Sequence, residues 1–228
     1  GRVRRIVVPE FETFRLANGL EVVVVEDRTL PLLQMRLALR AGSAAAPVAG
    51  LAEAAADLVL KGTRKETARQ LAEGFSGLGS RFDAQDQPDY LLFHGSLLAE
   101  SSERYFARMA DVLTQASFPG AEFDLWAKNM REELKIRRAD PGFLAEERLD
   151  KRLFPGHPYE NLSPTNASLD AMNRDAVADF YRRCCAPQGA VMVLVGDVKA
   201  AAARKMLDRV LGRWGGGAPE QAVAPMPP

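Results

Sequence analysis

The hydrophobic and polar positions of the chain divide it into short β-rich runs and longer helical segments. Two apolar runs flank Asn18-Gly19 within residues 11–27. Asn-Gly between such runs is the strongest short signal for a hairpin, because both positions tolerate positive φ. Residues 32–39 alternate in part between apolar and polar side chains and predict a third strand, which ends at residues 41–43.

The rest of the chain mixes predicted helices with predicted strands. Apolar residues at helical spacing, bounded by glycine or proline, predict helices at 50–60, 65–78, 101–116, 121–138, 143–153, 174–185 and 200–214. Further strands are predicted at 80–84, 90–98 and 190–195, with turns at 86–89 and 155–159. Because helices and strands neither alternate strictly nor segregate, the order predicts an α+β fold: a mixed, mostly antiparallel sheet with helices packed on one face.

The domain organisation follows from composition. Residues 1–214 are expected to form a single α+β domain, whose 47% hydrophobic content is ample for a buried core. Residues 215–228, GGGAPEQAVAPMPP, are rich in glycine, proline and alanine. Such a composition is typical of an interdomain linker.

The charge balance excludes several classes of partner. Thirty basic and thirty acidic residues give a formal net charge of zero, so no long-range field attracts nucleic acid or an anionic membrane. The pairs Arg137-Arg138 and Arg182-Arg183 are short and are expected to be solvated. No apolar run approaches the roughly 18 residues of a membrane span. No signal peptide is recognised at the basic start of the chain, from which an upstream segment could have been removed.

Outside the carboxylates discussed below, few side chains suggest a catalytic, metal-binding or cofactor-binding role. His94 in a predicted strand and His157 in a turn have no ligand-type residue at metal-binding spacing, and they support no Ser-His-Asp order. The sequence has no CxxC pair, phosphate-binding loop or dinucleotide fingerprint. The adjacent Cys184 and Cys185 predict no disulfide. The two tryptophans, Trp126 and Trp214, are expected to be packing residues.

The carboxylates of GLAEAAADLVLKGT, residues 50–63, leave two interpretations open. Glu53 and Asp57 are four positions apart and therefore share one helical face. Together with a distant Glu132 or Glu133, they could coordinate a hard cation. The alternative is an ordinary solvated or hydrogen-bonded helix face.

The whole chain resembles the N-terminal half of an inverted-zincin peptidase, the family of insulinase, pitrilysin and the mitochondrial processing peptidase. The matching segments are collinear along the chain. They are FRLANGLEVVVVED, LRAGSAAAPVAGLAEAAADLVLKGT, LGSRFDA, MREELKIRRADP, FPGHPY and FYRRCCAPQGAVMVLVGDV. The resemblance implies a processing-peptidase-like half-domain, followed by a linker and a second homologous domain that this sequence lacks.

The resemblance also implies a degenerate metal site. Active members carry His-x-x-Glu-His, in which two imidazoles bind zinc and the glutamate polarises the zinc-bound water. Here Glu53 and Asp57 stand at the histidine positions and Ala56 at the general base. Glu133 matches the distal ligand glutamate, with the neighbouring Glu132 as the alternative. Such an all-carboxylate set suits zinc poorly. We therefore expect no catalytic residue, no metal and no cofactor, with zinc confined to relatives that have the intact motif.

The resemblance suggests a role in a two-chain peptidase. We expect a non-catalytic, chamber-forming subunit that binds an extended peptide near Asp83 and Ala84 and pairs with a catalytic homologous chain as well as its own missing C-terminal half. The alternatives are a structural scaffold like the core subunits of the respiratory bc1 complex, or an active metalloendopeptidase with an atypical site. Bacterial origin and the periplasm are weakly favoured by analogy alone.

Overall fold

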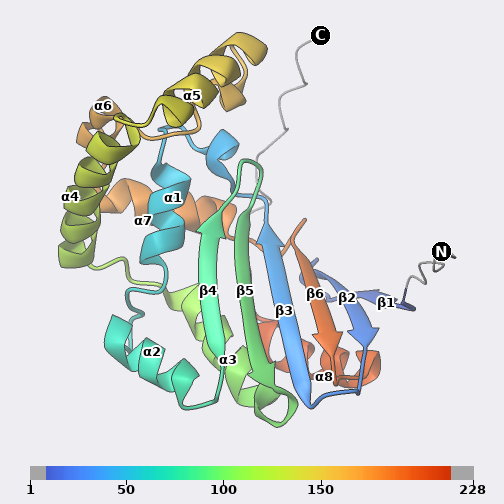
Figure 1. The fold of residues 1–228 in the computed structure, drawn as a ribbon. Helices are drawn as coiled ribbons and strands as arrows, with labels where there is room; N and C mark the ends of the chain where they lie inside the picture. Colours follow the sequence, from blue (N-terminus) through green and yellow to red (C-terminus); the bar gives the residue numbers. More distant parts are fainter. Residues whose placement is uncertain (1–8, 217–228) are drawn as a thin grey trace, which may run out of the picture.

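The computed structural model describes residues 9–216, and the expected linker positions 217–228 lie outside that part. Six strands form one sheet in the order β1-β2-β6-β3-β5-β4 (Figure 1). The strands are β1 (Glu12–Arg15), β2 (Glu21–Glu26), β3 (Leu32–Leu39), β4 (Arg81–Asp86), β5 (Leu91–Leu98) and β6 (Val191–Gly196). β2 and β6 are parallel and every other neighbouring pair is antiparallel, which confirms the predicted mixed, mostly antiparallel sheet.

The predicted hairpin is present, but its turn differs from the expected one. Gly19 has a φ of +93°, whereas Asn18 does not adopt positive φ. The amide of Gly19 donates to the Leu16 carbonyl at 3.0 Å, and the Leu16 amide donates to the Leu20 carbonyl at 2.9 Å. This pattern is a turn with one left-handed glycine, rather than a two-residue turn with two positive φ values. The side-chain Nδ2 atom of Asn18 instead donates to the carbonyl of Leu211, at 2.8 Å.

The helices follow the predicted segments with shifted ends. They are α1 (Leu51–Leu58), α2 (Ala68–Ser76), α3 (Ser102–Gln115), α4 (Gly120–Arg137), α5 (Pro141–Leu153), α6 (Asn166–Asp170), α7 (Arg174–Cys184) and α8 (Ala200–Leu211), with 3-10 turns η1 (Ser43–Ala45), η2 (Ala99–Ser101) and η3 (Pro158–Asn161). α2 begins later than expected because Thr67 caps it in a reciprocal box with Gln70. The short α6, which the sequence pattern did not predict, is capped in the same way by Thr165 and Ser168.

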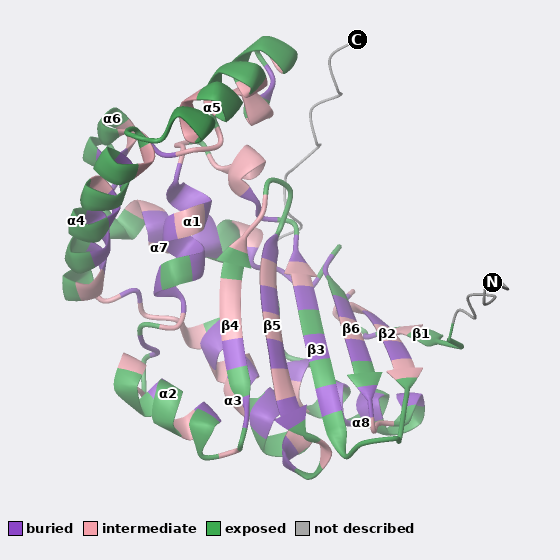
Figure 2. Cartoon of the chain, in the orientation of Figure 1, coloured by how far each residue is buried: buried purple, intermediate pink, exposed green. Residues whose placement is uncertain are grey.

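The sheet has one covered face and one open face. Alternate residues of β3 are buried, namely Leu33, Met35, Leu37 and Leu39. In Figure 1 the helices lie behind the sheet and beside β4, and Figure 2 shows the matching alternation of buried and exposed positions along the strands. This arrangement confirms that the helices pack on one face.

An aromatic cluster fixes the end of the sheet at β4. The ring centroids of Phe82 and Phe75 are 5.1 Å apart, and those of Phe82 and Phe93 are 5.6 Å apart. Tyr105 of α3 is fully buried and its hydroxyl donates to the Arg81 carbonyl at 3.1 Å. α2, α3, β4 and β5 are therefore packed together, which holds β4 in place as the edge strand of the sheet.

α1 packs tightly beside this edge. Its buried residues include Ala52, Ala54, Ala55 and Ala56, whose small side chains allow close approach to β4, α4 and α7. Trp126 and Trp214 are both buried, in agreement with their expected packing role. Cys184 and Cys185 are free thiols, so the expected absence of a bridge between them is confirmed. None of the helices between residues 9 and 216 has the length and apolar character to cross a membrane.

Candidate functional site

α1 and α4 bring together two of the carboxylates singled out in the sequence. Arg137, in the last turn of α4, lies between them. Its Nη2 atom is 3.4 Å from Glu53 Oε1, and its Nε atom is 2.9 Å from Glu133 Oε1. The side chains of Arg137 and Glu53 are 32% and 19% exposed, so this ion pair is mostly removed from water. A guanidinium of the chain itself therefore joins the helix of Glu53 to the helix of Glu133.

The third carboxylate has a separate partner. Asp57 Oδ2 accepts a hydrogen bond of 2.8 Å from Trp126 Nε1 of α4. Asp57 and Glu133 both line a shallow cavity of about 280 Å³, whereas Glu53 lines a neighbouring one of about 230 Å³ together with Asp86 and Arg137. Arg137 and Glu53 therefore line the smaller cavity together, whereas Asp57 and Trp126 line the larger one.

The remaining positions of the degenerate motif carry no reactive group. Ala56 is 3% exposed and presents only a methyl group. Glu132 points to Lys135, whose Nζ atom is 2.8 Å from Glu132 Oε1 on the exposed side of α4. Of the two glutamates considered from the sequence, Glu133 is thus the one that shares a partner with Glu53.

The electrostatics of the site make Glu53 harder to ionise than an exposed glutamate. Burial, reinforced by the nearby Asp86 and opposed by Arg137, raises the pKa of Glu53 to about 7. The pKa of Asp57 is also raised, by its partial burial, and the hydrogen bond from Trp126 opposes that increase. Placing three carboxylates near one another is costly, and the single cation of Arg137 compensates only in part.

These residues do not fit zinc. Zinc in proteins takes histidine nitrogen or cysteine sulfur in most sites, and here both histidine positions hold carboxylates that already bind Arg137 or Trp126. In the part of the chain that the structure describes, no three His, Cys, Asp or Glu side chains are grouped so as to hold a metal ion.

The two histidines lie in the elements predicted for them, a strand and a turn. His94 is a half-buried residue of β5. His157 is buried at the start of η3, where its Nδ1 atom accepts a hydrogen bond of 3.2 Å from the Tyr159 amide. The rings of Phe154 and Tyr159 pack against it.

Asp83 and Ala84, the residues expected near a bound peptide, lie in β4 at the edge of the sheet. Their side chains point to opposite faces, because successive residues of a strand alternate. Asp83 is opposite His94 on the open face, in register with Arg36 of β3. Ala84 packs against the core, so only its backbone is available at the edge.

Two partners in this site were not found from the sequence. Arg137 was expected to be solvated, yet it is half-buried between two carboxylates, which corrects that expectation for one member of the pair Arg137-Arg138. The spacing of four between Glu133 and Arg137 on one helix was a usable signal. No local pattern pairs Trp126 with Asp57, since 69 positions separate them.

Comparison with known proteins gives a consistent family. The model described as insulinase (peptidase family M16) matches residues 21–162, and that described as the peptidase M16 inactive domain matches residues 171–228. An uncharacterized zinc protease of Rickettsia bellii is 22% identical over 191 residues, which are 82% of this chain and 46% of that protein. The uncharacterized zinc protease YmxG of Bacillus subtilis is 22% identical over 185 residues, 79% of this chain and 45% of that protein.

Solved structures share the fold. A peptidase M16 inactive domain from Pseudomonas fluorescens has a TM-score of 0.89 at 24% identity, covering 96% of this chain and 54% of that chain. The periplasmic protease PqqL from Escherichia coli has a TM-score of 0.85 at 18% identity, covering 95% of this chain and 25% of that chain. This chain spans about half the length of the curated relatives it matches, 46% and 45%. Since the first family model covers more than half of the sequence, the chain belongs to the insulinase family of peptidases, peptidase family M16.

Proposed function

We propose that this chain is a non-catalytic member of its family, a chamber-forming and peptide-binding subunit. The observation that carries the proposal is the ion pair of Arg137 with Glu53 and Glu133. A guanidinium stands among the residues that would have to hold zinc, and Ala56 offers no base to activate water. Hydrolysis in this family requires both a metal-bound water and that base.

The edge of the sheet supports peptide binding. Within residues 9–216, no strand pairs with the side of β4 that faces away from β5. An extended peptide can add to such an edge through main-chain hydrogen bonds. Asp83 would then contact the peptide through its side chain, and Ala84 through its backbone.

The domain assignment is part of the same proposal. Residues 1–214 form one half, and residues 215–228 connect it to a second homologous domain that completes the chamber. The coverage of only about half of the curated relatives, 46% and 45%, supports this assignment. A catalytic homologous chain would supply the zinc chemistry.

A zinc titration by calorimetry tests the missing metal site, with the variant Glu133→Ala as its control. We expect no binding at micromolar zinc to either protein, and no chelator-sensitive hydrolysis of unfolded protein substrates. Tight one-to-one binding that disappears in Glu133→Ala would restore the alternative of an atypical active enzyme.

The pairing with a catalytic chain needs its own experiment. Tagged protein, purified from its native cells, should carry with it a chain that has an intact His-x-x-Glu-His motif. Addition of an extended peptide should then protect amides of β4 from hydrogen exchange. Recovery in a membrane complex, without peptide dependence, would favour a structural scaffold instead.

A further inference from the structure

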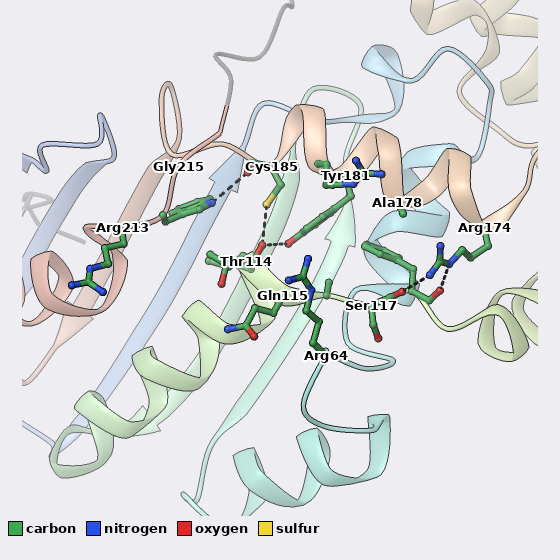
Figure 3. A pocket seen from close by; sticks show the side chains of 15 residues that line it. Arg64, Thr114, Gln115, Ser117, Arg174, Ala178, Tyr181, Cys185, Arg213 and Gly215 are labelled. Atoms are coloured by element: carbon green, nitrogen blue, oxygen red, sulfur yellow. Dashed lines mark hydrogen bonds between the residues drawn. The ribbon is translucent and has the colours of Figure 1, made fainter.

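A second hollow lies away from the carboxylate cluster, where the end of α3, the helix α7 and the residues after α8 meet (Figure 3). Its volume is about 640 Å³, within the range of about 300–1,000 Å³ typical of ligand sites. Five buried side chains contribute to its lining: Leu113, Phe118, Tyr181, Cys185 and Trp214. This hollow, which we call the arginine pocket, shares no lining residue with the cavities beside Glu53 and Asp57.

The lining of the arginine pocket is cationic. Among the described residues that line it, four are arginines and none is an aspartate or glutamate. The arginines are Arg64, Arg174, Arg182 and Arg213. Because the whole chain has equal numbers of basic and acidic residues, this is a local excess of positive charge rather than a property of the protein as a whole.

Two of these guanidinium groups are held in place by the protein. Arg174 Nε donates to the Phe118 carbonyl at 2.8 Å, and Arg174 Nη2 donates to the Ser117 carbonyl at 3.2 Å (Figure 3). Arg174 Nη1 also pairs with Asp175 Oδ1 at 2.6 Å, and Arg182 pairs with Asp179. By contrast, no ion pair or side-chain hydrogen bond of Arg64 or Arg213 is found within the described residues. These two cations are therefore available to a bound anion.

The floor of the pocket is fixed before any ligand binds. The hydroxyl of Tyr181 donates to the Leu113 carbonyl at 3.2 Å, and Trp214 Nε1 donates to the Cys185 carbonyl at 3.3 Å. Phe118 has a φ of +47°, a conformation that bulky residues rarely adopt. Backbone strain of this kind costs about 1–3 kcal/mol and is concentrated at functional sites.

The spacing of the cations selects the kind of anion. Arg174 and Arg182 already pair with carboxylates and mark only the length of the cationic lining: they are eight positions apart on α7, or about 12 Å along a helix. One carboxylate or phosphate group cannot span that distance. An extended peptide places side chains of the same face about 7 Å apart, so successive acidic side chains can reach separate guanidinium groups. We propose that the arginine pocket binds a peptide segment with several acidic side chains, and that Arg64 and Arg213 are its principal contacts.

Fluorescence anisotropy of labelled peptides tests this proposal on the full 228-residue chain. The probe is an eight-residue peptide of alternating Glu and Ala, and its reference replaces Glu with Gln. We expect the acidic probe to bind, to bind more weakly as salt increases, and to weaken about tenfold in the double variant Arg64→Ala/Arg213→Ala. Thermal unfolding should be unchanged, because between residues 9 and 216 these side chains make no polar contacts that support the fold.

The control is the double variant Arg104→Ala/Arg183→Ala. It removes the same charge from exposed arginines of α3 and α7 that do not line the pocket. We expect it to change the affinity by less than about twofold, through the general field alone. The proposal is overturned by an equal loss in this control, by equal binding of the Gln peptide, by no binding at all, or by equally effective competition from inorganic phosphate or a short RNA.

Discussion

Arg137 near the end of α4 donates a hydrogen bond of 3.4 Å to Glu53 of α1, across 84 positions of the sequence. The same guanidinium contacts Glu133, one turn earlier on its own helix. α1 and α4 are thereby joined by a cation that belongs to the chain. Without that cation, Glu53 would be a mostly buried carboxylate near Asp57, Glu133 and Asp86, all of which raise its pKa.

Replacement of Arg137 by alanine should destabilise the protein in a pH-dependent way. At pH 8 the change leaves an ionised, mostly buried Glu53 without its partner, and we expect a loss of about 1–3 kcal/mol in the free energy of unfolding. At pH 5 Glu53 is largely protonated, so the loss should be smaller. Urea denaturation at both pH values measures the difference.

Arg138→Ala is the matched control for that experiment. Arg138 is the next residue and pairs with Glu147 at 3.3 Å, with 40% of its side chain exposed. Its loss should cost less than about 1 kcal/mol and vary little between pH 5 and pH 8. Equal, pH-independent losses in the two variants would mean that Arg137 does not compensate the charge of Glu53.

Glu53 itself should make the protein less stable as pH rises through its titration range. The folded protein holds the Glu53 proton up to about pH 7, whereas the unfolded chain releases it near 4.5. Between these values the folded state binds more protons, so the free energy of unfolding decreases with rising pH and levels off above 7. The full change amounts to about 3 kcal/mol as an upper limit.

Glu53→Gln should remove this pH dependence, because the amide stays neutral. We expect the variant to match the original chain near pH 4.5 and to exceed its stability at pH 8. Glu132→Gln, which removes the same charge from the exposed side of α4, should leave the pH dependence in place. Thermal or urea unfolding from pH 4.5 to 8 decides the matter, and an unchanged slope in Glu53→Gln would contradict the raised pKa.

Local patterns in the sequence predicted most elements of the fold, and resemblance to a family predicted the degenerate site. Part of what they missed depends on partners distant in the chain. Asn18 was recognised as a turn residue, but its bond to the Leu211 carbonyl, 193 positions away, has no local signature. The early residues of the predicted helix 65–78 remain outside α2 because Thr67 caps it. That signal was readable, since Thr and Gln three positions apart form a capping box.

In the candidate site too, the sequence predicted the residues but not their tertiary contacts. Glu53, Ala56, Asp57 and Glu133 were chosen by position, without knowledge of what each side chain contacts. Whether such carboxylates bind a metal, water or another side chain depends on tertiary contacts. The structure supplies Arg137 and Trp126 as those contacts. A charge-balanced composition likewise gave no indication that four arginines gather at one pocket.

Trp126→Phe should raise the pKa of Asp57 further. The hydrogen bond from Trp126 Nε1 stabilises the carboxylate form, and it is the chief influence that opposes burial. Phenylalanine keeps most of the aromatic packing but cannot donate. Carboxyl carbon NMR chemical shifts, followed against pH, measure the pKa of Asp57 in both proteins. An unchanged or lower Asp57 pKa would show that the indole does not stabilise the charge.

Gly95→Ala should be among the most damaging single substitutions in the sheet. A β-carbon at Gly95 would lie 2.0 Å from the Tyr105 hydroxyl and 2.3 Å from the Arg81 carbonyl oxygen, so β4, β5 and α3 must separate. We expect a loss of about 3 kcal/mol in the free energy of unfolding, the upper end of the usual cost of overpacking, measured in urea. Tyr105→Phe in the same chain should restore only part of the lost stability, because the Arg81 carbonyl remains.

Gly120→Ala is the control for Gly95→Ala. Its β-carbon meets no atom within 4 Å, and reduced freedom of the unfolded chain should stabilise the protein by about 0.5 kcal/mol. Full recovery in Gly95→Ala/Tyr105→Phe would mean that the hydroxyl alone, and not the strand backbone, limits the space at this position.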